Sequence, residues 1–455
     1  MAKNIDNLKI PPQNIEAERF VLGSLMIDKN AIYKVADIID YGDFYHPIHS
    51  KIFRAIFELF GKSSPIDVIS VSNFLKEKGT LTEIGGASYL SELVAQVSTA
   101  SHVEHYANAI KDKKLLRDLI SLSEYLHEKA TQNNDDIDEL LDSIEQKILA
   151  ISQRSTIQRF VNIKDELQGA YNRIEKLHQK EGTGLRGVPT GFTAIDNMLS
   201  GLQPSDLIIL GARPSVGKTS LALNIASQAA KLGDKPVGIF SLEMSREQIT
   251  ERFLSTESGI PLWRLRTGRI HNDDEFMVIQ NALDKLSNVP LFIDDTPSPT
   301  VLQIRSMARR LQMEHGLGFV IIDYLQLITS RIRSDNVVQQ VAEISRGLKG
   351  LARELNIPVL ALSQLSRGLE SRDSKVPKLS DLRDSGSIEQ DADVVLFIHR
   401  KGKDNPELPV DEQNITDIII AKHRNGPTGT VKLRFDPEKA SFFNIDKTHS
   451  DDDIF

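Results

Sequence analysis

The stretch Asp206–Ala230, DLIILGARPSVGKTSLALNIASQAA, decides the fold of this 455-residue chain. Its apolar run Asp206–Leu210 predicts a strand, and Thr219–Ala230 predicts a helix. Between them, Ala212–Thr219 matches the P-loop pattern, except that an alanine replaces the first glycine and Gly211 stands just before it. In such a unit, successive backbone N–H groups and the helix N-terminus form a cradle for phosphate. A nucleotide-binding α/β domain is therefore predicted.

The side chains of this loop have separate expected tasks. Lys218 would reach the β- and γ-phosphates of ATP, and the Thr219 hydroxyl would ligate Mg²⁺. The nucleotide-binding residues expected here are Arg213, Ser215, Val216, Gly217, Lys218, Thr219 and Ser220. ATP and Mg²⁺ are thus the expected cofactors, and a chance strand–turn–helix is the alternative.

Outward from the P-loop, short apolar runs alternate with helical segments. This alternation is typical of a mostly parallel sheet buried on both faces. The expected strands are Asp206–Leu210, Val237–Ser241, Leu291–Ile293, Phe319–Ile322, Pro358–Ser363, Asp393–Ile398, Asp417–Ala421 and Val431–Phe435. The last three follow one another with little helix between them, which predicts an antiparallel edge.

A carboxylate at a strand end is needed to hold Mg²⁺, and two strands supply candidates. Asp295 follows the run Leu291–Ile293 but leads straight into a Thr-Pro-Ser-Pro turn, where capping alone explains an aspartate. Asp323 ends a purer apolar strand with no breaker after it, so we assign the metal to Asp323.

The base that activates water is a separate question. Glu243 follows the strand Val237–Ser241 and would lie beside the P-loop strand if the two strands are neighbours. A surface glutamate at a helix start is the alternative for Glu243.

The first 150 residues read as mostly helical and contain no recognisable chemistry. Amphipathic segments are expected after Pro11-Pro12 and at Ser50–Leu59, Val68–Lys78 and Ala87–Val97, followed by a helical hairpin from Val103 to about Ile151. Another amphipathic helix, Asn162–Lys180, stands alone between loops and must bury its apolar stripe on its own domain or on a neighbouring subunit. The expected division is 1–153, a linker at 154–190, an α/β domain at 191–446 and an acidic tail at 447–455.

Composition excludes several classes of protein. The chain has no cysteine, so disulfide scaffolds, thiolate nucleophiles and cysteine zinc sites are excluded. With 55 Lys+Arg against 63 Asp+Glu, the net charge of −8 argues against coating nucleic acid by bulk charge. His46 and His49 have no visible third ligand and are expected to be structural. No signal peptide or membrane-spanning run is apparent, which predicts a cytoplasmic protein.

Several long motifs stand in order along the chain: ARPSVGKTS, FSLEMS, VIIDYLQL, ALSQLSRGLESR, DLRDSGSIEQDADVV and IIIAKHRNGPTGTV. Together they resemble the bacterial DnaB-type replicative DNA helicases, hexameric motors with a RecA-like core. The resemblance covers most of the chain, including the N-terminal PPQNIEAE and VLGS segments. It implies an all-α N-terminal domain, a linker helix and a RecA-like P-loop ATPase domain.

The resemblance also implies roles for single residues. Lys218 and Thr219 would serve nucleotide and Mg²⁺, Asp323 would be the Walker B acid, and Glu243 the catalytic carboxylate. Gln364 matches a glutamine that senses the γ-phosphate and signals to the DNA loops, a task suited to an amide that both donates and accepts hydrogen bonds. Lys422 and Arg424 match a basic pair that reaches the ATP of the adjacent subunit, as arginine fingers do. On a strand these two would face the same side.

The DNA loops implied by the resemblance lie in Arg367–Ser387. Locally the segment Gln364–Arg383 carries a charge of +2, with five basic residues against three acidic ones. It has no aromatic residue, so a sequence-independent grip on the backbone is expected. The DNA-binding residues expected here are Arg367, Arg372, Arg383, Asp384 and Gly386. A solvated loop is the alternative for each charge taken alone.

The implied function is an ATP-driven replicative helicase whose homohexamer encircles single-stranded DNA, moves 5′ to 3′ and opens forked duplex. The implied partners are primase, a helicase loader and other replisome proteins, and the implied place is the bacterial nucleoid. A RecA-like recombination or repair ATPase is the second interpretation, and a non-catalytic ATP-switched adaptor is the third. The tip Asp451–Phe455 is expected to be a solvated tail, with partner recruitment as the alternative.

Overall fold

The computed structural model describes residues 10–132 and 185–445, apart from 234, 271, 331–335, 367, 370, 371, 373, 383–385, 405, 406 and 408, together with short runs between 137 and 175. The chain divides into two compact units, Met1–Glu166 and Leu167–Phe455. The expected acidic tail lies outside the described residues, as does most of the expected linker. No helix among the described residues is long and apolar enough to cross a membrane.

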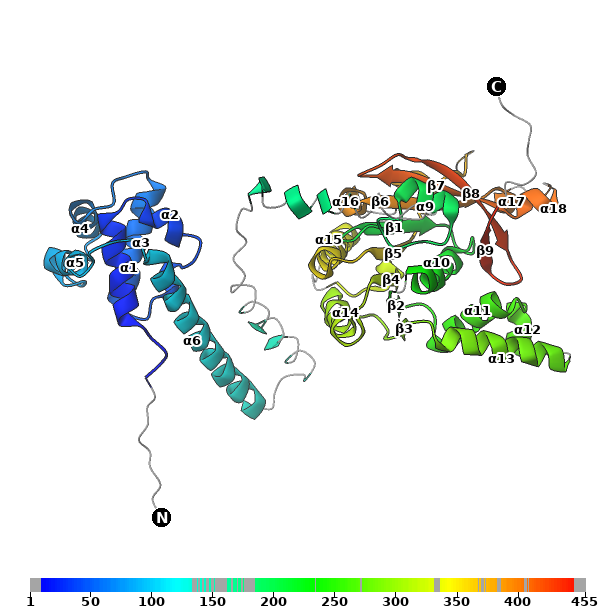
Figure 1. The fold of residues 1–455 in the computed structure, drawn as a ribbon, viewed down its shortest axis with the longest axis horizontal. Helices are drawn as coiled ribbons and strands as arrows, with labels where there is room; N and C mark the ends of the chain where they lie inside the picture. The colour runs from blue at the N-terminus through cyan, green and yellow to red at the C-terminus, as the bar shows by residue number, and fades with distance from the viewer. Residues whose placement is uncertain are drawn as a thin grey trace, which may run out of the picture. The chain divides into compact units, whose positions relative to one another are not determined.

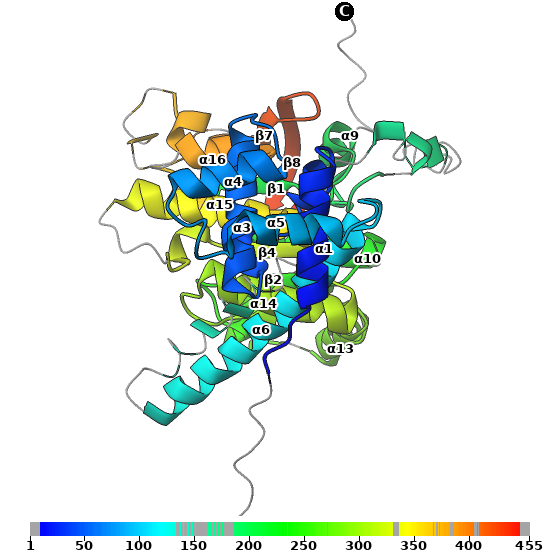
Figure 2. The same ribbon diagram turned by 90° about the vertical axis from the view of Figure 1, so that its left-hand side faces the viewer.

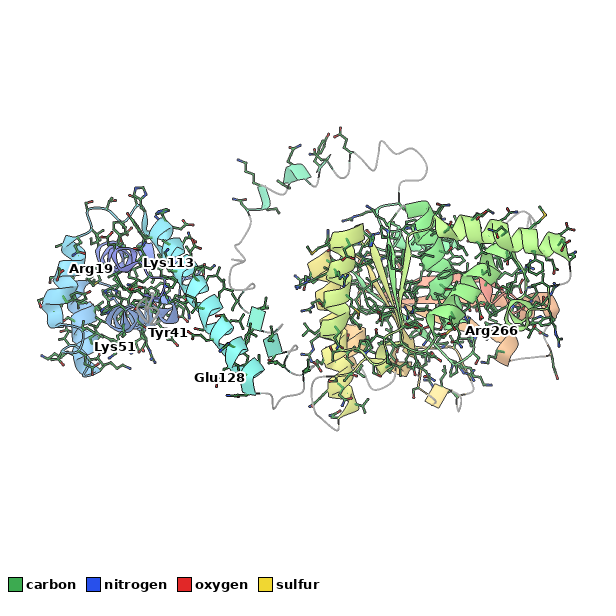
Figure 3. All side chains as sticks on the ribbon, turned by 90° about the horizontal axis from the view of Figure 1, so that it is seen from below. Arg19, Tyr41, Lys51, Lys113, Glu128 and Arg266 are labelled. Carbon is green, nitrogen blue, oxygen red and sulfur yellow. The ribbon has the colours of Figure 1, made fainter. Side chains whose placement is uncertain are left out.

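The first unit is helical throughout its described part, as predicted (Figures 1 and 2). Its helices are α1 Ile15–Ile27, α2 Ala31–Val35, α3 Pro47–Gly61, α4 Val68–Glu77, α5 Gly86–Ala95 and α6 Val103–Gln132, with a 3₁₀ turn η1 at Tyr41–Asp43. Asn14 begins α1 by accepting the Ala17 N–H at 3.0 Å. The five residues of α2 are too short a run for the helical period to reveal. Helix α6 extends well past the cluster formed by α1, α3 and α5, with Lys113 and Glu128 labelled along it (Figure 3).

A buried polar chain joins three helices of this unit. The His49 Nδ1 lies 2.6 Å from Glu18 Oε2, and its Nε2 lies 2.7 Å from the Tyr89 hydroxyl. Glu18 is 1% exposed and also accepts the Tyr45 N–H at 2.6 Å. His46 is the N-cap of α3 and accepts the Ile48 N–H through its ring. Both histidines therefore serve the structure, and no group of three or more metal-ligating side chains occurs among the described residues.

Few residues beyond α6 are described in this unit, and those between 137 and 151 are helical. Lys147 Nζ lies 4.0 Å from the centroid of the Tyr125 ring, whose hydroxyl is 3.4 Å from Ser143 Oγ. These contacts bring the segment back against α6.

The second unit is built on a nine-stranded sheet in the order β3-β2-β4-β5-β1-β6-β7-β8-β9. The strands are β1 Leu207–Ala212, β2 Val237–Ser241, β3 Leu291–Asp294, β4 Phe319–Asp323, β5 Val359–Gln364, β6 Val394–Arg400, β7 Ile415–His423, β8 Gly429–Asp436 and β9 Ser441–Asn444. The strands from β3 to β6 are parallel, and β7, β8 and β9 add an antiparallel edge. The predicted mostly parallel sheet with an antiparallel edge is confirmed.

All eight expected strands are present, with three differences. The antiparallel edge begins one strand later than expected, because β6 runs parallel to β1 and only its other side pairs with β7. Strand β9 was not expected, since four residues give too short a pattern to stand out. The condition attached to Glu243, that β2 neighbours β1, is not met: β4 and β5 lie between them.

Helices cover both faces of this sheet (Figure 1). They are α9 Thr193–Leu199, α10 Lys218–Gly233, α11 Arg246–Ser258, α12 Leu262–Thr267, α13 Asp273–Ser287, α14 Val301–His315, α15 Val337–Leu355, α16 Gly386–Asp391, α17 Lys401–Asp404 and α18 Val410–Gln413, with 3₁₀ turns η2 Leu325–Leu327 and η4 Leu379–Asp381. Alternate residues of β1 enter two separate cores: Ile208 packs on the side of α10, and Ile209 on the side of α14 and α15. Burial on both faces explains why the strands read as continuous apolar runs.

Candidate active site

The P-loop joins β1 to α10 at the carboxyl ends of the parallel strands. Ser215 and Gly217 have positive φ values, 61° and 104°, so the backbone N–H groups of the turn can converge on an anion. A side chain at 217 would also lie 3.0 Å from the Phe442 ring and 3.1 Å from the Phe435 ring. Glycine is therefore required here both by the backbone and by the packing beneath the loop.

A cavity of about 290 Å³ lies over this loop. It is lined by Ala212, Arg213, Pro214, Ser215, Gly217, Lys218, Thr219, Ser220, Glu243, Met244, Arg252 and Gln364. Every expected nucleotide-binding residue except Val216 is among them. The Val216 side chain is buried in the core beneath the loop, which leaves only its backbone for a ligand.

Lys218 and Thr219 both face Asp323, the last residue of β4. The Thr219 hydroxyl donates to Asp323 Oδ2 at 2.5 Å, and Lys218 Nζ lies 3.5 Å from Oδ1. The ammonium group also lies 4.3 Å from the centroid of the Tyr324 ring. Burial lowers the pKa of Lys218 from its usual value, and the charges of Asp323 and Glu243 oppose this shift.

The donor set at Asp323 fits a hard divalent cation. Asp323 is 3% exposed, and its Oδ1 atom accepts no hydrogen bond from the described residues. A buried carboxylate oxygen of this kind, beside a hydroxyl at the same point, is the oxygen-rich pair that Mg²⁺ uses in P-loop sites. These two side chains suit a metal held partly by phosphate oxygens and water.

Asp295, the rival carboxylate, is held elsewhere. It accepts the Arg246 N–H at 3.1 Å and pairs with the Arg246 Nε at 2.8 Å. The hydrogen bond from the Arg246 backbone, followed by the arginine charge, lowers the pKa of Asp295. Because β3 is the edge strand, Asp295 stands two strands farther from β1 than Asp323 does at the end of β4. The choice of Asp323 over Asp295 agrees with this placement.

Glu243 and Gln364 enter the cavity from different strands. Glu243 follows β2 and lines the cavity although β2 is not next to β1. The carboxyl ends of all the parallel strands lie at one edge of the sheet, so adjacency to β1 is not needed. Gln364 ends β5 directly beside Ala212 of β1. Its backbone carbonyl accepts a hydrogen bond from the Gln326 side chain at 3.2 Å, which links the end of β5 to η2.

Arg252 of α11 lines the same cavity and was missed by the sequence reasoning. Its Nη1 donates to Ser220 Oγ at 3.2 Å, and its Nε is buried without a hydrogen-bond acceptor among the described residues. Burial, followed by the charge of Arg266, lowers the pKa of Arg252. No motif marks it, because one arginine inside an amphipathic helix looks like any solvated charge. The partly buried Arg252 adds a second positive charge, beside Lys218, to the lining of the cavity.

Lys422 and Arg424 lie towards the amino ends of the parallel strands, whereas the P-loop lies at their carboxyl ends. Strand β7 is antiparallel to β6, and Lys422 pairs with Val395 near the start of β6. The P-loop follows Ala212, which pairs with Ile398 near the end of β6. Three residues of strand separate these two levels, about 10 Å along the strand direction. The chain therefore does not bring its basic pair to its own phosphate cradle.

The expected DNA loops are described only in part. Arg367, Arg383 and Asp384 lie outside the described residues. Arg372 forms an ion pair with buried Asp381, so its guanidinium is engaged at the base of the loops in this structure. Gly386 begins α16, and a Cβ built there meets nothing within 4 Å. Packing within the described residues therefore gives no reason for a glycine at 386.

Comparison with known proteins covers nearly the whole chain. The family model described as "DnaB-like helicase C terminal domain" matches residues 187–444, and "DnaB-like helicase N terminal domain" matches residues 10–112. Replicative DNA helicase DnaB of Geobacillus stearothermophilus is 48% identical over 440 residues, 96% of each chain. Replicative DNA helicase DnaC of Bacillus subtilis is 45% identical, over 98% of this chain and 97% of the relative.

A solved structure agrees with these matches. A DnaB-like replicative helicase, solved in a study of its interactions with primase, superimposes with a TM-score of 0.78 at 32% identity. The match covers 95% of this chain and all of the other. A second solved structure, an isolated ATPase domain, matches with a TM-score of 0.60 at 37% identity, over 63% of this chain and all of that domain.

Proposed function

The chain belongs to the DnaB-like family of replicative DNA helicases, and from this membership we propose that it hydrolyses ATP between neighbouring subunits to move along single-stranded DNA. It is an ATP-dependent helicase of DNA replication. The proposal concerns which residues carry out the reaction and how subunits share it.

Hydrolysis begins in the cradle of the P-loop. Backbone N–H groups of Ser215–Ser220 bind the phosphates, and the Lys218 ammonium binds the β- and γ-oxygens. Glu243 orients a water molecule on the γ-phosphorus and accepts its proton as the new P–O bond forms and the bond to ADP breaks. Gln364 and Arg252, which line the same cavity, would contact the γ-phosphate. Release of the γ-phosphate would then change the contacts of Gln364 at the end of β5.

Thr219 and Asp323 are the residues that would hold Mg²⁺. When bound, the metal neutralises charge on the β- and γ-oxygens. The unsatisfied Asp323 Oδ1 and the adjacent Thr219 hydroxyl support this assignment. Lys218, at 3.5 Å from Oδ1, keeps a positive charge beside that carboxylate while the site is being loaded.

The basic pair carries the proposal that subunits share each site. Lys422 lies about 10 Å from its own P-loop level along the strands, and the Arg424 side chain is 64% exposed. A guanidinium placed this way is suited to a nucleotide on a neighbouring subunit, where it would stabilise charge on the γ-phosphate. Hydrolysis would then require an assembly, and a closed homohexamer is the proposed one.

DNA would be bound by the segment between β5 and α16. Its local charge of +2 and the open space at Gly386 support contacts to the phosphate backbone. A closed ring needs basic residues only along its pore, so the overall charge of −8 is compatible with a DNA partner. By analogy with the relative solved in a study of its interactions with primase, the N-terminal unit would dock primase. Loading would require a further protein to open the ring.

The segment Asn162–Lys180 is proposed to latch subunits together. Its described apolar residues Ile163, Leu167 and Tyr171 are exposed, which favours burial on another subunit over burial on their own. An exposed apolar surface that such a helix could cover lies on α12 and α13, at Trp263, Phe276, Met277 and Leu283. Arg266, labelled in Figure 3, pairs with Glu251 beside this surface.

The proposal is tested with Arg424→Ala in an assay of ATP hydrolysis stimulated by single-stranded DNA. We expect turnover to fall by about 10³-fold or more, as for other arginine fingers, with ATP binding retained. Lys432→Ala is the matched control, because Lys432 is an exposed base on the neighbouring strand β8 and should leave turnover unchanged. Wild-type turnover in Arg424→Ala would refute the finger assignment.

A further inference from the structure

Asp393 lies at the junction of three parts of the second unit. It stands between the end of α16 and the start of β6, and it is 3% exposed. Its Oδ2 accepts the Leu207 N–H at 2.9 Å and the Lys349 ammonium at 2.5 Å. Its Oδ1 lies 3.4 Å from Arg424 Nη1, and its backbone carbonyl accepts the Arg424 N–H at 2.8 Å. Asp393 thus holds the proposed finger twice: its backbone carbonyl binds the Arg424 backbone, and its carboxylate binds the Arg424 side chain.

Lys422, the other member of the basic pair, is bound to the same short segment. Its Nζ donates to the carbonyl oxygens of Glu389 and Gln390, near the end of α16. These carbonyls belong to the last turn of the helix, where a cation is favoured. Both basic side chains therefore take their position from residues 389–393.

Helix α16 connects this segment to the proposed DNA loop. It begins at Gly386, the last of the residues expected to bind DNA, and ends at Asp391. Ile388 anchors the helix in the core that also contains α15, and Lys349 of α15 binds Asp393. Only two residues separate the end of α16 from the start of β6, so a shift of the helix would be passed directly to the basic pair.

We infer that Asp393 is the positioning residue for Arg424, and that α16 ties the aim of the Lys422–Arg424 pair to the state of the DNA loop. The inference deepens the proposed function and rests on it. DNA bound in one subunit would orient, through α16, the fingers that this subunit sends into its neighbour's ATP site. In this inference Asp393 acts through Arg424 and needs no contact of its own with nucleotide or DNA.

The inference is tested with Asp393→Asn, which keeps the shape of the side chain and removes its charge. We expect kcat for DNA-stimulated ATP hydrolysis to fall about 5- to 20-fold, with the Kd for ATP changed less than about twofold. Turnover without DNA should fall less, so that the stimulation by DNA decreases. A purely structural defect would lower both rates alike. Asp206→Asn is the matched control, because Asp206 is a neighbouring buried carboxylate with no side-chain contact to the basic pair among the described residues.

A double-mutant cycle with Arg424→Lys decides whether Asp393 acts through Arg424. If it does, the combined variant should be no slower than Arg424→Lys alone within about threefold. Effects that multiply, or a wild-type kcat in Asp393→Asn, would overturn the inference. If Asp393→Asn does not fold, Asp393→Glu keeps the charge, shifts it by one methylene and takes its place in the cycle. If Arg424→Lys itself has wild-type turnover, the finger assignment has failed; if only Asp393→Asn does, the finger stands and the inference alone fails.

Discussion

At the scale of single residues, Asp206 is a buried carboxylate that destabilises the folded state when it is ionised. Burial, followed by the negative charge of Asp393, raises the pKa of Asp206 from 3.8 to about 6, and Lys349 opposes this only in part. The folded state therefore binds this proton more tightly than the unfolded chain does. Ionised Asp206 destabilises the fold above about pH 6, and the penalty disappears as the pH falls towards 4.

Asp206→Asn should therefore raise the free energy of unfolding at pH 8 by about 1–3 kcal/mol. The gain over wild type should shrink as the pH falls through about 6 and be absent near pH 4. Urea unfolding of both proteins across this range measures the difference. An unchanged difference from about pH 8 to about pH 4 would show that titration of Asp206 is not its source.

Substitution of His49 is expected to lower the free energy of unfolding, whereas substitution of Asp206 should raise it. His49 is fully buried between Glu18 and Tyr89, so His49→Ala removes the side-chain partner of the buried Glu18 carboxylate. We expect the free energy of unfolding to fall by about 3 kcal/mol. His46→Ala, which removes only an N-cap, should cost about 1 kcal/mol. Equal losses for the two variants in urea unfolding would contradict the role given to the buried pair.

The sequence predicted some residues of the site and missed others. Lys218, Thr219 and Asp323 are found by motif and strand pattern, because a phosphate cradle needs residues close together in the chain or at a strand end. Arg252 was missed, since its place in the cavity depends on how α11 packs. The ion pair of Arg372 with Asp381 was missed for the same reason. Side chains brought together by tertiary packing leave no local pattern.

At the scale of elements, the segment proposed to latch subunits, Asn162–Lys180, gives the clearest prediction. Leu167 is 58% exposed, so Leu167→Asp should not unfold the chain. If the helix latches subunits, the variant should shift the assembly towards smaller species in native mass measurement, because a buried charge opposes docking. Gln168→Asp, at an exposed neighbouring position, should leave the assembly intact. If both variants form intact rings, the proposal that this segment holds subunits together would be wrong.

The order of strands could not be read from the sequence. Apolar runs located eight strands, and their continuity predicted burial on both faces. The sequence contains no signal for the insertion of β4 and β5 between β2 and β1, which places Glu243 two strands farther from the P-loop strand than a direct neighbour would be. Glu243 still lines the cavity, because the carboxyl ends of all the parallel strands lie at the same end of the sheet. Strand β9 was missed, although Phe442 of that strand packs under Gly217.

At the scale of the whole molecule, the position of the basic pair supports the proposal that each ATP site is shared between two subunits. The P-loop lies at the carboxyl ends of the parallel strands, and Lys422 lies towards their amino ends. The recombination ATPase considered from the sequence is not favoured, because both DnaB-like models match, including the N-terminal one at residues 10–112. The adaptor interpretation is contradicted by membership in a helicase family.

The most direct test of shared sites is ATP hydrolysis by rings assembled from equal amounts of Lys218→Ala and Arg424→Ala subunits. The first variant lacks the cradle cation and keeps the finger, and the second does the reverse. Random mixing should give about a quarter of the interfaces both intact parts, so turnover should rise well above that of either variant alone. Rings of wild type mixed with Lys218→Ala calibrate the effect of an inactive neighbour. A mixture no more active than its two parents, while those calibration rings stay active, would contradict hydrolysis between subunits.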